Sequence, residues 1–146
     1  MHFDQSTEET IHVYVGVIKP ACSPLLHSAA IPFLAEGVDA AAIFVGSKNV
    51  AAPGPGAGAY SIPKAGLSQL ARIAALELAG QGIRVNVLHP NQVFDTAIWS
   101  ESVLTQRAEH YGLSVEEYKT NNLLKVEITS RDVAELVCNL ASPVFS

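Results

Sequence analysis

A continuous apolar run, AAAIFVG at residues 40–46, limits the possible folds more than any other feature of this chain. The run has the length of a strand but no alternation of apolar and polar residues, which is typical of a strand buried on both faces of a parallel sheet. It is followed by a loop rich in proline and glycine, a largely apolar segment at 61–79 that predicts a long helix, and a second strand-like run, IRVNVLHP, at 83–90. Because strand, helix and strand in this order form a right-handed crossover, we expect an α/β fold with a parallel sheet.

The helix expected over 61–79 carries apolar residues on more than one side. One face is formed by Leu67, Leu70, Ala71, Ala74 and Leu78, and further apolar surface by Ala65, Ile73 and Leu76. A helix with this pattern is buried on more than one side. We therefore expect the sheet against one side and a second subunit of a homo-oligomer against the other. Pro63 fits the first turn of this helix, where its missing N–H costs no hydrogen bond.

The flanking segments extend the same alternation of strands and helices. A β-branched run at 11–18 predicts another strand, although prolines follow it closely. The apolar residues of PLLHSAAIPFL at 24–34, Phe33 included, recur at helical spacing and predict a helix that ends at Gly37. Further helices are expected over 100–110, over 114–119, and after an N-cap at either Thr129 or Ser130.

The composition favours one compact domain spanning 1–146. Hydrophobic residues make up 49% and charged residues 16% of the chain, which predicts a substantial core and not a disordered segment. The net charge of −5 comes without a cluster of Lys and Arg, so we expect no nucleic-acid partner. No leader-like segment or membrane-length apolar run is visible, which predicts a cytoplasmic protein without membrane contact. Cys22 and Cys138 are interpreted as buried free thiols, and no metal site is expected.

Three polar residues are candidates for catalysis. Tyr60 and Lys64 are four residues apart at the start of the long helix, so their side chains emerge on the same helix face. As an isolated pair they are more often a solvated helix edge. Ser47, however, directly follows the run at 40–46, and ligands of open parallel sheets bind at the carboxyl ends of strands. The loop between Ser47 and Tyr60 would bring both residues to one crevice.

The candidates lie within a segment that resembles the short-chain dehydrogenase/reductase family, GSKNVAAPGPGAGAYSIPKAGLSQLARIAALELAGQGIRVNVLHP. The resemblance rests on Ser47, on the Tyr-x-x-x-Lys pattern of Tyr60 and Lys64, and on the strand IRVNVLHP that follows. It extends from about Phe33 to the end of the chain. It implies the C-terminal half of a doubly wound, Rossmann-type parallel sheet and an NAD(P)-dependent oxidoreductase. It also implies that Tyr60 exchanges a proton with the substrate oxygen and that Ser47 hydrogen-bonds the same oxygen. Lys64 would stabilise the phenolate and, with Tyr60, contact the nicotinamide nucleotide.

The same resemblance implies cofactor contacts after the second strand. Pro90, Val93 and Thr96 match the segment that contacts the nicotinamide in this family. A His-Pro-Asn sequence stands where the family usually has Pro-Gly, and one extra residue precedes Thr96. Val93 and Thr96 are therefore equally compatible with an ordinary loop.

A narrower resemblance is carried by SKNVAAPGPG, PNQVFDTAIW and EHYGLSVEEYKTNNLLKVEITSRDVAEL. These segments are similar to the dehydrogenase domain of bacterial bifunctional aldolase/short-chain dehydrogenases, of the rhamnulose-phosphate aldolase and alcohol dehydrogenase type. The similarity implies a small alcohol or carbonyl substrate, such as a sugar-derived alcohol, and a substrate lid at 97–125. Trp99 and Tyr111 lie in this segment, where they either line the substrate pocket or contribute to packing.

Several features of a complete family member have no match in the chain. No Gly-rich turn with a downstream acidic residue marks a nucleotide-binding half, and GPGAGAY at 54–60 precedes the catalytic helix instead of opening the first strand-helix unit. The family's catalytic asparagine would fall near Lys19. We therefore expect a single domain truncated at both ends. The choice between NAD and NADP stays open, because the deciding residue would lie in the absent half.

Two alternatives to an NAD(P)-dependent enzyme follow from these observations. The chain could be a truncated, catalytically silent remnant that acts at most as an interaction module. It could also be related to the sugar-nucleotide epimerases of the extended branch, which share the Tyr/Lys pair, but no nucleotide-sugar domain is visible. Binding of NADH would separate the enzyme from the remnant.

Overall fold

The computed structural model describes residues 13–16 and 23–145. The chain divides into two compact units, one formed by Met1–His89 with Val137–Ser146 and the other by Pro90–Leu136. Each unit has a core of its own, one between helices and a parallel sheet and one around a group of aromatic side chains.

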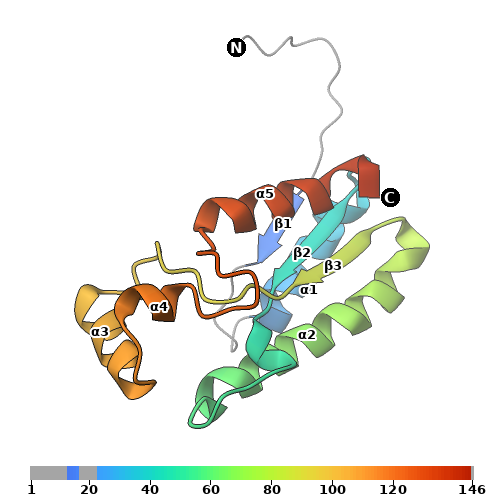
Figure 1. Ribbon diagram of the computed structural model, residues 1–146. Coiled ribbons are helices and arrows are strands. Elements are labelled where there is room, and N and C mark those ends of the chain that lie inside the picture. Colours follow the sequence, from blue (N-terminus) through green and yellow to red (C-terminus); the bar gives the residue numbers. More distant parts are fainter. Residues whose placement is uncertain (1–12, 17–22, 146) are drawn as a thin grey trace. The chain divides into compact units, whose positions relative to one another are not determined.

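The first unit is built on a three-stranded parallel sheet in the order β1-β2-β3 (Figure 1). The strands are β1 (Val13–Gly16), β2 (Ala41–Val45) and β3 (Arg84–Leu88). Helix α1 (Ser23–Ala35) lies between the first two strands in the chain, and α2 (Gly58–Leu78) lies between the last two. Ile43 of β2 pairs with Val15 on one side and with Asn86 on the other. The strand-helix-strand unit predicted from residues 40–90 is confirmed, and its apolar run forms the central strand.

Helices cover both faces of β2, which explains why this strand contains no polar position. Ala42 and Phe44 belong to the core that α1 and α2 form on one face. Ile43 points to the opposite face and is only 1% exposed. Figure 1 shows the carboxyl-terminal end of α5 (Ser130–Ala141) on that side of the sheet. Burial on two faces is the arrangement of a doubly wound sheet, so the predicted fold class, a partial Rossmann-type α/β sheet, is confirmed.

Helix α2 buries the face that its apolar pattern predicts. Leu67, Ala71, Ala74 and Leu78 are buried and Leu70 is partly buried against the same core. The remaining large apolar side chains are open to solvent in the single chain, with Ile73 41% and Leu76 82% exposed. Gly82, at a φ of 72°, ends the 3-10 turn η2 (Ala79–Gln81) that follows the helix, as expected for a glycine at this position.

The start of α2 differs from the sequence expectation. The helix begins at Gly58 and not at Ser61. The amide of Ser61 donates to the carbonyl oxygen of Ala57 over 2.8 Å, which closes a helical turn before Pro63 is reached. Pro63 therefore lies beyond the first turn and removes one main-chain hydrogen bond, so its interpretation as a first-turn proline was wrong. The earlier start places Tyr60 in the first turn of the helix.

The N-terminal predictions are confirmed in part. The helix expected over 24–34 is α1, but Phe33 is 64% exposed, whereas Ala30 and Leu34 on the neighbouring face are buried. The strand expected at 11–18 is confirmed at Val13–Gly16, and its other residues lie outside the described residues.

The prediction of buried free thiols is confirmed for Cys138 as to the free thiol and wrong as to its burial, and it is untested for Cys22, which lies outside the described residues. Cys138 is a free but exposed thiol. It follows the buried Val137 in α5. Consecutive helical residues point about 100° apart, which turns the thiol away from the buried face.

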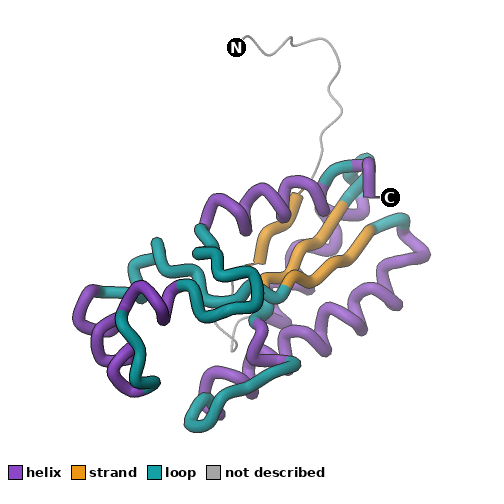
Figure 2. Tube along the Cα trace, in the orientation of Figure 1, coloured by secondary structure: helices purple, strands orange, loops and turns teal. Residues whose placement is uncertain are grey.

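The second unit consists mainly of helices and loops (Figure 2). It contains α3 (Glu101–His110), α4 (Val115–Lys119) and the first residues of α5, which confirms the helices expected over 100–110 and 114–119. Ser100 caps α3, and Ser114 forms a capping box with Glu117 at the start of α4. Of the two N-cap candidates for α5, Thr129 is the cap, since its hydroxyl accepts from the amide of Asp132.

The helices of the described ranges include none that is long and apolar enough to cross a membrane.

Candidate active site

The end of β2 places Ser47 at the carboxyl edge of the sheet. Ser47 is 7% exposed and caps the 3-10 helix η1 (Lys48–Val50), where its Oγ accepts from the amide of Asn49 over 3.2 Å. A serine hydroxyl offers one hydrogen and two lone pairs. Because the cap uses a lone pair, the hydroxyl hydrogen is left for another acceptor, as a substrate oxygen would require.

The first turns of α2 carry the other two candidate catalytic side chains. Tyr60 and Lys64 are one turn apart, and Lys64 Nζ lies 6.0 Å from the centre of the Tyr60 ring. Tyr60 is 51% exposed, so its phenol is accessible from solvent. The helix is also packed against η1, the turn that Ser47 caps. The structure thus gathers the elements that carry the three predicted catalytic residues.

Lys64 connects the helix to the sheet. Its Nζ donates to the carbonyl oxygen of Val45, the last residue of β2, over 2.8 Å. Partial burial of the ammonium lowers the pKa of Lys64 from its ordinary value of 10.5, since removal from water disfavours the charged form. An ammonium that is poorly solvated acts more strongly on a nearby phenol than one in bulk water.

His89 is the functional candidate that the sequence patterns do not single out. It follows β3, and its Nδ1 lies 3.2 Å from the amide nitrogen and 3.0 Å from the carbonyl oxygen of Ser47. Its ring also lies beside Gly46, where a Cβ atom would stand 2.6 Å from Nδ1. The signal in the sequence is a histidine near the end of one predicted strand and a glycine at the end of its neighbour.

The residues predicted to contact the cofactor after β3 belong to the second unit, while Tyr60 and Lys64 belong to the first. Pro90 is the first residue of the second unit. Val93 forms an isolated parallel bridge with Ile128, and the Thr96 hydroxyl donates to the Val93 carbonyl over 3.0 Å. Their prediction as nicotinamide contacts stays a prediction.

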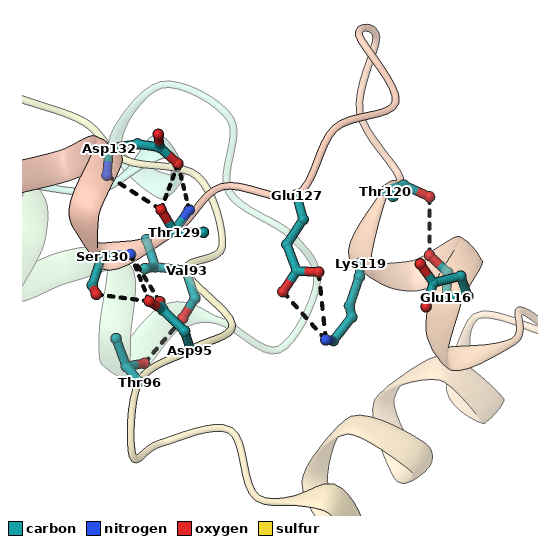
Figure 3. A network of polar contacts seen from close by, with 10 residues as sticks. All are labelled: Val93, Asp95, Thr96, Glu116, Lys119, Thr120, Glu127, Thr129, Ser130 and Asp132. Carbon is teal, nitrogen blue, oxygen red and sulfur yellow. Dashed lines mark hydrogen bonds and ion pairs between the residues drawn. The ribbon is translucent and has the colours of Figure 1, made fainter.

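Asp95 fixes the same loop to the start of α5. Figure 3 shows its carboxylate accepting from the amide of Ser130 at 2.8 and 3.0 Å and from the Ser130 hydroxyl at 2.7 Å. The side-chain hydrogen bond of Ser130, followed by its amide, lowers the pKa of Asp95. The loop that holds Val93 and Thr96 is therefore tied down by two partners, Ile128 and Ser130.

The aromatic residues of the second unit pack mainly against one another. Trp99 lies 4.9 Å from Phe94 and 6.2 Å from Tyr118, measured between ring centres, so it contributes to the core of this unit. Tyr111 stacks on Tyr118 at 5.7 Å and stays 52% exposed. Gln92 donates to the Tyr118 hydroxyl over 2.8 Å, and burial raises the pKa of Tyr118. Of Trp99 and Tyr111, the two residues considered as pocket lining, Tyr111 is the one whose ring is more exposed to solvent.

The groups present suit a nicotinamide nucleotide. Among residues 13–16 and 23–145, no three His, Cys, Asp or Glu side chains gather as metal ligands would. The ammonium of Lys64 has three donors, one of which reaches Val45. The remaining donors, beside an exposed phenol, are suited to the hydroxyl groups of a ribose.

Comparison with known proteins identifies relatives over most of the chain. A family model described as enoyl-(acyl carrier protein) reductase matches residues 21–146. An uncharacterised oxidoreductase of Bacillus subtilis, YuxG, is 41% identical over 105 residues, which are 68% of this chain and 15% of that protein.

Two solved structures share the fold. Sorbitol-6-phosphate 2-dehydrogenase from Erwinia amylovora matches with a TM-score of 0.68 and 27% identity, over 84% of this chain and 48% of its own. An NADPH-bound short-chain oxidoreductase from Pseudomonas aeruginosa, described as containing an atypical catalytic centre, matches with a TM-score of 0.67 and 27% identity. That match covers 80% of this chain and 44% of the other. The chain therefore spans half or less of the length of these relatives.

Proposed function

Since the chain belongs to the short-chain dehydrogenase/reductase family, we propose that it takes part in the NAD(P)-dependent interconversion of a small alcohol and its carbonyl compound. One observation carries this proposal: Lys64 joins the end of β2 to the helix of Tyr60, holding its ammonium 2.8 Å from the Val45 carbonyl and 6.0 Å from the Tyr60 ring.

The chemistry divides among three side chains. In the direction of reduction, Tyr60 donates its phenolic proton to the carbonyl oxygen of the substrate, and in oxidation it accepts the proton of the alcohol. Lys64 stabilises the negative charge left on the phenol oxygen. Ser47 donates its free hydroxyl hydrogen to the same substrate oxygen. The nicotinamide supplies or accepts the hydride when the cofactor is bound.

The proposed cofactor contacts are those that the family resemblance implies. Lys64 and Tyr60 would hold the nicotinamide ribose, and Pro90, Val93 and Thr96 would lie along the nicotinamide. The NADPH-bound relative supports a nicotinamide nucleotide in general. The choice between NAD and NADP is left to measurement.

The proposed substrate is a sugar-derived alcohol or a small hydroxy-aldehyde. The resemblance to the dehydrogenase domain of bifunctional aldolase/short-chain dehydrogenases supports it, and so does the similarity to a sorbitol-6-phosphate dehydrogenase. The segment 97–125 would form the substrate lid, where Tyr111 offers an exposed aromatic face for a sugar ring.

A homo-oligomer is proposed through the exposed face of α2. Ile73 and Leu76 leave apolar surface uncovered on the single chain, and a second copy would bury it. Light scattering of the purified chain measures its mass in solution. A monomer at micromolar concentration would contradict this part of the proposal.

The test of the function is binding and turnover by the purified chain. NADH and NADPH are titrated while the fluorescence of the reduced nicotinamide is followed, and a panel of sugar alcohols and short diols is then offered with NAD⁺ or NADP⁺. We expect saturable binding of one reduced cofactor and turnover that is lost in Tyr60→Phe. A folded chain that binds neither cofactor would contradict the proposal and favour a catalytically silent interaction module.

A further inference from the structure

The imidazole of His89 occupies the space next to Gly46 at the end of the neighbouring strand. A Cβ atom on Gly46 would lie 2.6 Å from His89 Nδ1 and 2.8 Å from its Cε1, closer than side chains approach one another. Glycine at this position therefore allows the ring to lie against the main chain. The last ladder contact between the two strands, from the Gly46 amide to the Leu88 carbonyl at 2.8 Å, lies directly beside it.

From this position, His89 Nδ1 reaches the main chain of Ser47. Nδ1 lies 3.2 Å from the Ser47 amide nitrogen and 3.0 Å from its carbonyl oxygen. With the hydrogen on Nε2, Nδ1 accepts from the amide, and with the hydrogen on Nδ1 it donates to the carbonyl. Either tautomer binds the main chain of Ser47.

Ser47 needs such a partner because it stands where the sheet has ended. The regular pairing of β2 with β3 runs from Ala41 to Val45. Beyond it, the Ser47 side chain is held by the Asn49 amide and its main chain by His89. Two independent contacts therefore hold Ser47, one at its side chain and one at its main chain.

We propose that His89 is a positioning residue, which holds the main chain of Ser47 so that the serine hydroxyl meets the reacting oxygen of the substrate. The inference rests on the proposed function, in which Ser47 binds that oxygen. It assigns no proton transfer to His89.

The experiment compares four variants of the whole chain: His89→Leu, His89→Asn, Ser47→Ala, and Ser47→Ala with His89→Leu. Leucine keeps the bulk of the ring but has no polar atom. Asparagine places an amide group near the position of Nδ1, where it accepts or donates as either tautomer would. Circular dichroism and NADH affinity establish that each variant folds and binds cofactor.

We expect His89→Leu to lower kcat by up to about 10²-fold, the size of effect that a small misplacement of a reacting group produces. His89→Asn should recover most of this loss. In the Ser47→Ala background, His89→Leu should lower kcat little further, since no serine hydroxyl is left to position.

Each other outcome is decisive. Equal losses from His89→Leu with and without the serine hydroxyl would show a role in folding only, and would overturn the inference. So would full activity of His89→Leu, or an asparagine variant no better than leucine. If the unmodified chain has no turnover with any cofactor and substrate of the panel, the proposed function itself has failed, and this role fails with it.

Discussion

Lys64 on α2 donates from Nζ to the main-chain carbonyl of Val45, the residue that ends β2, across 2.8 Å. The contact spans an entire strand-to-helix connection and fixes the first turns of α2 against the edge of the sheet. Tyr60 lies one turn before Lys64, and Ser47 lies two residues after Val45. The Lys64 ammonium thereby links the helix that carries the Tyr60 hydroxyl to the strand end that carries the Ser47 hydroxyl.

Replacing Tyr60 by phenylalanine tests the proposed proton donor. The ring is half exposed, so removing its oxygen should leave the fold and the NADH affinity almost unchanged. We expect turnover to fall by about 10²–10⁴-fold, the usual contribution of a general acid or base. Tyr111→Phe is a matched control, because Tyr111 is equally exposed at 52% and phenylalanine keeps the aromatic face that Tyr111 would offer the substrate. A similar loss in both variants would contradict a specific role for Tyr60.

Lys64→Met should abolish most of the turnover while leaving a folded protein. Burial lowers the pKa of Lys64 in the folded state. Between this lowered pKa and the ordinary value of 10.5, the unfolded chain therefore binds more protons than the folded chain. In that alkaline interval the stability contributed by Lys64 rises with pH. Urea unfolding should show this rise in the unmodified chain relative to Lys64→Met. Identical pH dependence of the two proteins would contradict a partly buried ammonium.

Gly46→Ala should push the His89 ring away from the main chain. The new methyl group would lie 2.6 Å from Nδ1, and overpacking of this kind costs about 1–3 kcal/mol. The cost should be smaller in Gly46→Ala with His89→Ala, because the ring that causes the collision is gone. Urea denaturation of both single variants and the double variant measures this coupling. Strictly additive losses would show that Gly46 is needed for another reason.

The local pattern of the sequence was sufficient to predict the sheet and the helix that follows it. The strand at 40–46 is recognised from its unbroken apolar run, and the end of α2 from the glycines that follow it. Both signals lie in consecutive residues. The start of α2 was misplaced, because Pro63 suggested a first turn where the chain had already become helical. The contact of His89 with Ser47 was beyond such reasoning, since it joins residues 42 positions apart through the ends of two strands.

Arg84→Met should destabilise the end of α5. The guanidinium of Arg84 donates to the carbonyls of Leu140 at 2.8 Å and Ala141 at 2.9 Å, the last two residues of that helix. Hydrogen bonds from a charged donor contribute about 1.5–3 kcal/mol, and methionine keeps only the apolar stem. Urea unfolding should show a loss of this size, with a smaller loss for Arg84→Lys, which retains the charge. Unchanged stability of Arg84→Met would show that solvent replaces the guanidinium at no cost.

Asp95→Asn should weaken the attachment of the loop at 93–96 to α5, and it should do so in a pH-dependent way. Hydrogen bonds from Ser130 lower the pKa of Asp95 below its ordinary value of 3.8, so the folded chain favours the charged carboxylate. Its stabilising contribution is complete above about pH 4 and is lost as the pH falls through the lowered value.

The measurement is urea unfolding of the unmodified chain and Asp95→Asn from neutral pH to about pH 3, the acid side of the ordinary aspartate titration. The difference in stability should be largest at neutral pH and should shrink in acid, because protonation turns the carboxylate into a group much like the amide. Some acid dependence must remain in the variant, since hydrogen bonds from Thr129 lower the pKa of Asp132 as well. Ser130→Ala is the partner control: it removes the hydroxyl donor but keeps the amide, so its loss at neutral pH should be the smaller one. A difference between Asp95→Asn and the unmodified chain that stays constant across this range would mean that the carboxylate charge plays no part in holding the loop.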